Sequence, residues 1–334
     1  MPRLAIALAY NLPGKTNDRS IILSRRFRSG RGTGSTMTIS ETSRSEFITL
    51  RGLRTHVRHW GRDGAPKLFM LHGWMDVAAS FQFLVDALSH EWHVIAMDWR
   101  GFGETDWSTR YPGTESYWFG DYVADLEALV DHYQPEGQVD LLGHSMGANL
   151  VCIYAGVRPQ RVRRVVDLEG FGMTRTHPGQ APGRLAKWLD ELRERPQLRT
   201  YASQREVAER LQKTNPRLRD DRAAFLAAHW SRQDADGQWA LLADPAHKMI
   251  NPQLYRIDEI MAIWAQVTAP VLHVEGRDSP TLARLAHKEP IPEFRERFRA
   301  FRDFREATVD DAGHMIHHDQ PEAVARLTEA FLLA

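Results

Sequence analysis

The sequence predicts an α/β fold in which a mostly parallel central sheet is flanked by helices. Short apolar runs rich in β-branched residues alternate with amphipathic stretches of helical periodicity, which is typical of strand–helix–strand units. The predicted strands of this alternating part are Lys67–Leu71, His93–Met97, Val139–Leu142, Val162–Leu168 and Val271–Val274. The predicted helices are Val77–Ser89, Tyr122–Tyr133, Ala148–Tyr154 and the final helix Pro321–Leu333.

Two further strands precede this alternation. Residues Phe47–Leu50 and Thr55–Trp60 alternate between apolar and polar side chains, and Gly52 lies between them. This pattern predicts a β-hairpin. With the hairpin included, Val162–Leu168 is the sixth predicted strand and Val271–Val274 is the seventh.

The strand–helix alternation stops over residues 173–268, which are helical in pattern and punctuated by prolines. The apolar spacing predicts helices at Leu185–Leu192, Val207–Leu211, Ala223–Trp230 and Leu254–Trp264. We therefore expect a helical cap inserted between strands 6 and 7. Such a cap would cover the carboxyl edge of the sheet, where ligands bind in open α/β folds. Residues 46–172 and 269–334 would form the two parts of the core.

The first 45 residues differ from the rest in composition. They are rich in Arg, Ser, Thr and Gly, with few acidic residues and no apolar periodicity, which predicts a flexible arm. Met37 lies inside this arm, so one hypothesis is that the native chain starts there and lacks residues 1–36. A targeting peptide is the alternative interpretation.

Composition narrows the possible partners. The 334 residues include 43 Lys and Arg and 43 Asp and Glu, so charge gives no support for binding to nucleic acid or an anionic membrane. This balance favours a neutral, apolar small molecule as substrate. The one cysteine, Cys152, excludes an intrachain disulfide and a cysteine-based metal site. With no apolar run of about 18 residues, we expect a soluble, cytoplasmic protein. Its oligomeric state is not indicated.

The motif Gly143-His144-Ser145-Met146-Gly147 lies between a predicted strand and a predicted helix. At such a junction the chain must turn sharply, and small residues on either side of Ser145 avoid a clash across the turn. The Ser145 hydroxyl would then stand at a helix N-terminus, where developing negative charge is favoured. The motif therefore predicts a nucleophilic serine. The alternative is a glycine-rich turn in which serine caps the helix.

Backbone donors for an oxyanion are predicted from the same turn and from an upstream loop. The strand Lys67–Leu71 leads into His72-Gly73-Trp74, and Gly73 allows the backbone to approach a substrate carbonyl. We expect the amide N–H groups of Trp74 and Met146 to form an oxyanion hole. His72 could be a base, but we expect it to hold the loop backbone instead.

A histidine follows the last strand-like run of the chain. His314 comes shortly after Ala307–Val309 and is the candidate general base for the Ser145 hydroxyl. His317 and His318 lie just beyond it, and we interpret them as surface histidines of a loop.

Together these motifs resemble the α/β-hydrolase superfamily, in particular its serine-nucleophile, esterase- and lipase-like branch with a helical cap. The resemblance rests on His72-Gly73, Asp98-Trp99-Arg100-Gly101-Phe102-Gly103, Gly143-His144-Ser145-Met146-Gly147 and Gly313-His314, in that order. It implies an α/β-hydrolase fold, a nucleophile–acid–histidine triad, an acyl-enzyme intermediate and no cofactor. Relatives that open epoxides or remove halides carry Asp at the elbow, whereas this chain has Ser145.

The resemblance leaves two candidates for the acid. Asp278 lies in the loop after Val271–Val274, where most relatives keep the acid, but it is two residues beyond Gly276 rather than the usual three. Glu169 follows the sixth strand, where some dehalogenating relatives keep theirs. We predict a triad of Ser145, Asp278 and His314, with Glu169 as the competing acid.

The expected function is hydrolysis of a small to medium carboxylic ester or a related acyl compound. A carbon–carbon bond hydrolase or a lactonase would use the same triad. A non-catalytic small-molecule receptor of this fold is the alternative from another class. No cofactor and no metal ligand are predicted.

Overall fold

A nine-stranded, mostly parallel sheet forms the centre of the computed structural model, which describes residues 21–24 and 42–334. The strand order is β1-β11-β10-β7-β6-β4-β5-β3-β2, and only the β2–β3 and β3–β5 pairs are antiparallel. The strands are β1 (Ile21–Ser24), β2 (Arg44–Leu50), β3 (Leu53–Trp60), β4 (Lys67–Leu71), β5 (His93–Met97), β6 (Val139–His144), β7 (Val162–Leu168), β10 (Val271–Gly276) and β11 (Phe304–Val309). The predicted α/β fold with a mostly parallel sheet is confirmed.

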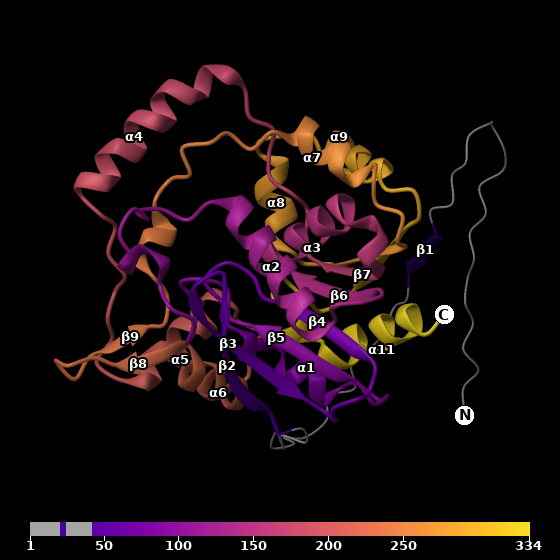
Figure 1. The fold of residues 1–334 in the computed structure, drawn as a ribbon, viewed down its shortest axis with the longest axis horizontal. Helices are drawn as coiled ribbons and strands as arrows, with labels where there is room; N and C mark the ends of the chain where they lie inside the picture. The colour runs from indigo at the N-terminus through magenta and orange to yellow at the C-terminus, as the bar shows by residue number, and fades with distance from the viewer. Residues whose placement is uncertain (1–20, 25–41) are drawn as a thin grey trace.

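Both faces of the sheet are covered, which explains why its strands are continuously apolar rather than alternating. Successive residues of a strand point to opposite faces. In β4, Phe69 packs in the cluster that contains α2 (Phe119–Tyr133) and α3 (Met146–Val157), while Leu68 packs with α1 (Gln82–Asp86) and α11 (Pro321–Leu332). Figure 1 shows these two pairs of helices on opposite sides of the strands.

The predicted insertion lies between β7 and β10. It contains α4 (Ala181–Arg193), α5 (Gln204–Thr214), α6 (Asp220–Trp230) and α7 (Ile257–Trp264). It also contains a hairpin that the periodicity did not predict, β8 (Ser231–Gln233) paired with β9 (Trp239–Leu241). These strands are only three residues long, too short for a period-2 pattern to be recognised.

The helices of this insertion are not one compact layer. Leu218 and two residues of α6 pack on Phe83 of α1. Helix α4 stands away from the sheet in Figure 1, and none of its residues is buried. Whether the insertion covers the site as a cap remains a proposal.

The N-terminal arm and one helix differ from the prediction. Ile21–Ser24, inside the predicted arm, pair with β11 as a parallel edge strand, and β2 already begins at Arg44. Met37 lies outside the described residues. The predicted helix Val77–Ser89 is shorter, because the 3-10 turn η1 (Ala78–Phe81) precedes α1.

Several short helices complete the part of the chain that the structure describes. Three lie near the C-terminus: α8 (Pro280–Ala286), α9 (Ile291–Glu296) and α10 (Ile316–Asp319). The others are 3-10 turns, namely η2 (Ser108–Arg110), η3 (Pro159–Arg161), η4 (Pro178–Gln180), η5 (Pro245–Lys248) and η6 (Arg297–Ala300). None of the helices in residues 42–334 is long and apolar enough to cross a membrane.

Two leucines on different helices test where the core lies. Leu129 of α2 is fully buried, whereas Leu189 of α4 is 46% exposed. We expect Leu129→Ala to lower the free energy of unfolding by about 2–5 kcal/mol, because it leaves a cavity. The matched Leu189→Ala change should stay within about 0.5 kcal/mol. Urea unfolding measures both, and similar losses would contradict this assignment of the core.

Candidate active site

Ser145 occupies a strained turn between β6 and α3. Its φ of 53° and ψ of −111° lie in a region that non-glycine residues rarely adopt. A Cβ at Gly143 would collide with the backbone of Ala148, and one at Gly147 would collide with the carbonyl of Leu71. The Ser145 N–H donates to the carbonyl of Leu168 at 2.8 Å. The two glycines therefore permit a turn that β7 helps to hold.

Three side chains form a hydrogen-bonded relay that begins at this turn. The Ser145 hydroxyl lies 3.0 Å from Nε2 of His314, and Nδ1 of His314 lies 3.0 Å from Oε2 of Glu169. His314 comes from the loop after β11, and Glu169 directly follows β7 with a φ of 59°. A carboxylate beside Nδ1 favours the tautomer whose Nε2 accepts the serine proton.

The structure corrects our choice of Asp278 as the acid partner. Its carboxylate lies 2.7 Å from Arg217, and its side chain is 49% exposed. The neighbouring Ser279 faces the relay instead and donates its hydroxyl to Oε2 of Glu169 at 2.5 Å. The residue after Asp278 thus occupies the register in which relatives place the acid, and the carboxylate comes from the adjacent strand.

Glu169 is buried and well supplied with donors. Its Oε1 accepts the amide N–H of Gly276 at 2.7 Å, while Oε2 accepts from Ser279 and faces His314. Only 2% of the residue is exposed. Because a buried carboxylate without donors is unfavourable, these contacts both satisfy Glu169 and fix the orientation of the His314 ring.

The upstream loop approaches the nucleophile closely. A Cβ added at Gly73 would lie 3.2 Å from Cβ of Ser145. Among the described residues, neither the amide of Trp74 nor that of Met146 has a hydrogen-bond partner. Both amides are therefore free to bind a substrate oxygen beside Ser145, and their role as an oxyanion hole stays a prediction.

His72 holds the loop backbone. Its Nδ1 donates to the carbonyl of Gly73 at 2.8 Å, and its Nε2 accepts the amide N–H of Trp99 at 3.0 Å. Burial lowers the pKa of His72 to about 4, so the ring stays neutral at pH 7. With both nitrogens used in this way, His72 is not a base for Ser145.

Asp98, in the loop after β5, supports the same region. Its carboxylate accepts the amide N–H of Ala78 at 2.7 Å and lies 2.7 Å from Nδ1 of His56. Burial by itself raises the pKa of Asp98, but the hydrogen bond from His56 lowers the pKa to about 2. This carboxylate therefore anchors the start of η1, directly after the loop of His72, Gly73 and Trp74, which we call the oxyanion loop.

Three histidines near the relay were not anticipated in these positions. His144 is buried, and its Nε2 donates to the backbone carbonyl of His314 at 2.8 Å, which positions the relay histidine. The interpretation of His317 and His318 as surface residues is wrong, because they are 0% and 3% exposed. Their rings pack against Phe81 and Phe83. The sequence did show that both residues lie close to His314. It could not show their burial, because that depends on packing against η1 and α1.

Comparisons with known proteins agree with this fold. The family model for the alpha/beta hydrolase fold matches residues 66–321. The chain therefore belongs to the α/β-hydrolase fold family. A serine hydrolase-like protein of Danio rerio is 28% identical over 82% of this chain and 83% of its own length.

Solved structures of other proteins share this fold, two of them over nearly their whole length. A hypothetical protein from Pseudomonas aeruginosa PAO1 superposes with a TM-score of 0.76 and 23% identity, over 87% of this chain and 99% of the other. The thioesterase domain from the curacin biosynthetic pathway superposes with a TM-score of 0.73 and 20% identity, over 86% and 98% of the two chains. At these identities the likeness supports the fold alone.

The position of the acid can be tested by matched amide substitutions. We expect Glu169→Gln to lower kcat by about 10³–10⁴-fold, because the amide favours the wrong tautomer of His314. Asp278→Asn removes only an exposed ion pair and should change stability by less than about 1 kcal/mol while kcat is retained. Hydrolysis of a p-nitrophenyl ester measures kcat for both variants. Loss of activity in Asp278→Asn alone would overturn the assignment.

The buried, neutral His72 gives a pH-dependent stability. The ordinary histidine pKa is 6.5, and the folded value is about 4. Below pH 6.5 the unfolded chain binds a proton that the folded protein does not, so stability falls as the pH drops from 6.5 towards 4. This one group lowers the free energy of unfolding by about 3 kcal/mol over that range. Urea unfolding across this range should show the loss, and a flat profile would contradict it.

Proposed function

We propose that this protein is a serine hydrolase that cleaves a small to medium carboxylic ester, or a related acyl compound, through an acyl-enzyme intermediate. The observation that carries the proposal is the relay of Ser145, His314 and Glu169, with a distance of 3.0 Å at each step. A helix-capping serine does not need a histidine and a buried carboxylate aligned behind it.

In the proposed first half-reaction, Oγ of Ser145 attacks the substrate carbonyl carbon while Nε2 of His314 accepts its proton. Glu169 stabilises the resulting imidazolium through Nδ1. The tetrahedral oxygen accepts hydrogen bonds from the amides of Trp74 and Met146, each worth about 3 kcal/mol in the transition state. His314 then gives its proton to the leaving alkoxide, and the acyl group remains on Ser145.

In the second half-reaction, water replaces the alcohol. His314 accepts a proton from the water, the hydroxide attacks the acyl carbon, and the same two amides bind the oxyanion. The carboxylic acid leaves as the proton returns to Oγ of Ser145. No redox step is involved, so the residues described above suffice for the cycle.

A neutral, apolar acyl or alkyl group is the best match to the surroundings of Ser145. The side chain of Trp74, next to Gly73 in the oxyanion loop, is 52% exposed. Met173, at the start of the insertion, is 50% exposed. Exposed apolar side chains of this size at the carboxyl edge of the sheet favour apolar ligands. The serine hydrolase-like name of the zebrafish relative supports an acyl substrate.

Labelling with a fluorophosphonate probe tests the nucleophile directly. We expect one probe per chain, attached to Ser145 through displacement of fluoride, and located by peptide mass spectrometry. Ser145→Ala should abolish labelling and lower kcat by about 10⁴–10⁶-fold. Ser89→Ala, a change in a hydroxyl that is bonded to Glu329 and remote from the relay, should do neither.

The result that would overturn the proposal is a folded wild-type protein that takes up no probe, because a non-catalytic receptor would behave in this way. If the probe does bind, a panel of p-nitrophenyl esters, lactones and diketones identifies the substrate class. We expect the highest kcat/KM among the esters. Turnover confined to lactones or diketones would sink the ester assignment while the nucleophile stands.

A further inference from the structure

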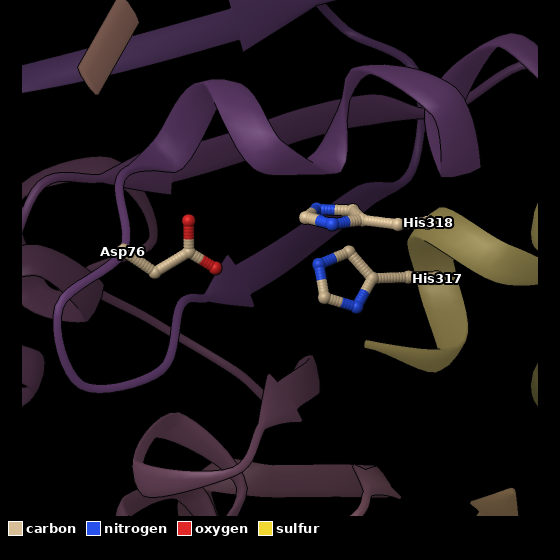
Figure 2. Close-up of side chains that lie close together, drawn as sticks. All are labelled: Asp76, His317 and His318. Atoms are coloured by element: carbon tan, nitrogen blue, oxygen red, sulfur yellow. The ribbon is translucent and has the colours of Figure 1, made fainter. Parts of the chain in front are cut away.

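Asp76, His317 and His318 form a buried cluster behind the oxyanion loop. One ligand atom from each residue lies within 4.8 Å of those of the other two. Figure 2 shows the carboxylate of Asp76 approaching from its loop and the two imidazoles projecting towards it from α10. Two segments distant in sequence thus bring three metal-binding side chains together.

Their hydrogen bonds leave the facing atoms unused. Oδ1 of Asp76 accepts the Val77 amide N–H at 2.8 Å and the Ser80 hydroxyl, but Oδ2 has no partner among the described residues. Nε2 of His318 and both ring nitrogens of His317 also lack a partner there. Buried polar atoms are rarely left unpaired, so this concentration of orphaned lone pairs indicates a ligand.

The histidine His318 is held in the orientation of a metal ligand. The backbone carbonyl of Ser80 lies beside the imidazole of His318, and Nε2 is the ring nitrogen that has no partner among the described residues. Metal-binding histidines typically donate their other N–H to a carbonyl in this way, which directs the free lone pair at the ion. Ser80 also holds Oδ1 of Asp76, so one residue orients two candidate ligands.

The buried charge of Asp76 also favours a bound cation. Asp76 is 3% exposed and pairs with no Lys, Arg or His within the part of the chain that the structure describes. The indole N–H of Trp230 faces this carboxylate as a donor, but a neutral indole supplies no counter-charge. A buried carboxylate without a counter-charge is unfavourable, and a bound cation would neutralise it.

We propose that Asp76, His317 and His318 bind a divalent transition-metal ion, for which Zn²⁺ is the best match. Two imidazoles and a carboxylate are a typical zinc ligand set, with metal–ligand distances of about 2.0–2.2 Å. Tetrahedral ligand atoms at those distances are roughly 3.3–3.6 Å apart. Small rotations of the three side chains would shorten the distances among their ligand atoms to these values. Mg²⁺ and Ca²⁺ fit poorly because they prefer oxygen ligands.

The location gives the ion a definite consequence. Asp76 lies two residues after Trp74, and His317 lies three residues after His314. The ring of His317 also packs against that of His144, whose Nε2 bonds to the His314 carbonyl. A bound ion would therefore join the oxyanion loop to the loop of the relay histidine. This inference concerns binding alone and does not rest on the proposed function.

Metal-free wild-type protein titrated with Zn²⁺ in a calorimeter tests the site. We expect one Zn²⁺ per chain and a rise in Tm of several degrees when Zn²⁺ is in excess of its Kd. Substitution by Co²⁺ should give the visible absorption of a tetrahedral site with nitrogen and oxygen ligands. If the folded wild type binds no Zn²⁺ and shows no Tm shift, the proposal is wrong, whatever the variants do.

Variants assign the ligands. Asp76→Asn, His317→Gln and His318→Gln should each weaken Zn²⁺ binding by at least about 100-fold, more than the loss of an outer-shell partner. His287→Gln, at an exposed histidine of the same chain, is the control for adventitious binding and should leave the affinity unchanged. Circular dichroism in EDTA shows which variants fold. Folded variants that bind Zn²⁺ as the wild type does would overturn the assignment.

Discussion

The turn at Ser145 is the constraint on which the rest of the site depends. With Ser145 at a φ of 53°, the hydroxyl leaves the sheet at the carboxyl end of β6, and this is possible only because Gly143 and Gly147 carry no Cβ. Because Gly147 has no Cβ, α3 also packs closely against the end of β4. The Met146 amide and the loop after Gly73 therefore lie on either side of the Ser145 hydroxyl. Strain at a single residue thus brings the proposed nucleophile and the proposed oxyanion donors together.

The relay extends this arrangement across the sheet. Strand β7 lies next to β6, and β10 lies between β7 and β11, so Glu169 and the His314 loop converge on Ser145 from the same edge. Glu169 receives donors from Gly276 and Ser279, which follow β10. Four strands therefore contribute to one hydrogen-bonded relay, which explains why it lies at the carboxyl edge of a parallel sheet.

Behind the site, several polar groups are buried where apolar packing is the norm. His72 is neutral and uses both nitrogens to hold the oxyanion loop, and His144 holds the backbone of His314. Each makes at least one hydrogen bond that holds the relay or the oxyanion loop, whereas neither ring nitrogen of His317 has a partner among the described residues. His72 and His144 thus fix the geometry of the relay, whereas His317 and His318 have buried ring nitrogens without a partner among the described residues.

The sequence by itself determined the fold, and it pointed to Ser145, His314 and the loop of Gly73 and Trp74 as the proposed site. These features lie in local patterns: an apolar strand, a turn that requires glycine, and a helix start. Only the tertiary structure decided between Glu169 and Asp278. Both follow strands at the same edge, and the outcome depends on which side chain of the next loop, Asp278 or Ser279, faces inward. The burial of His317 and His318 was likewise decided by the packing of α10 on η1 and α1, which no local pattern encodes.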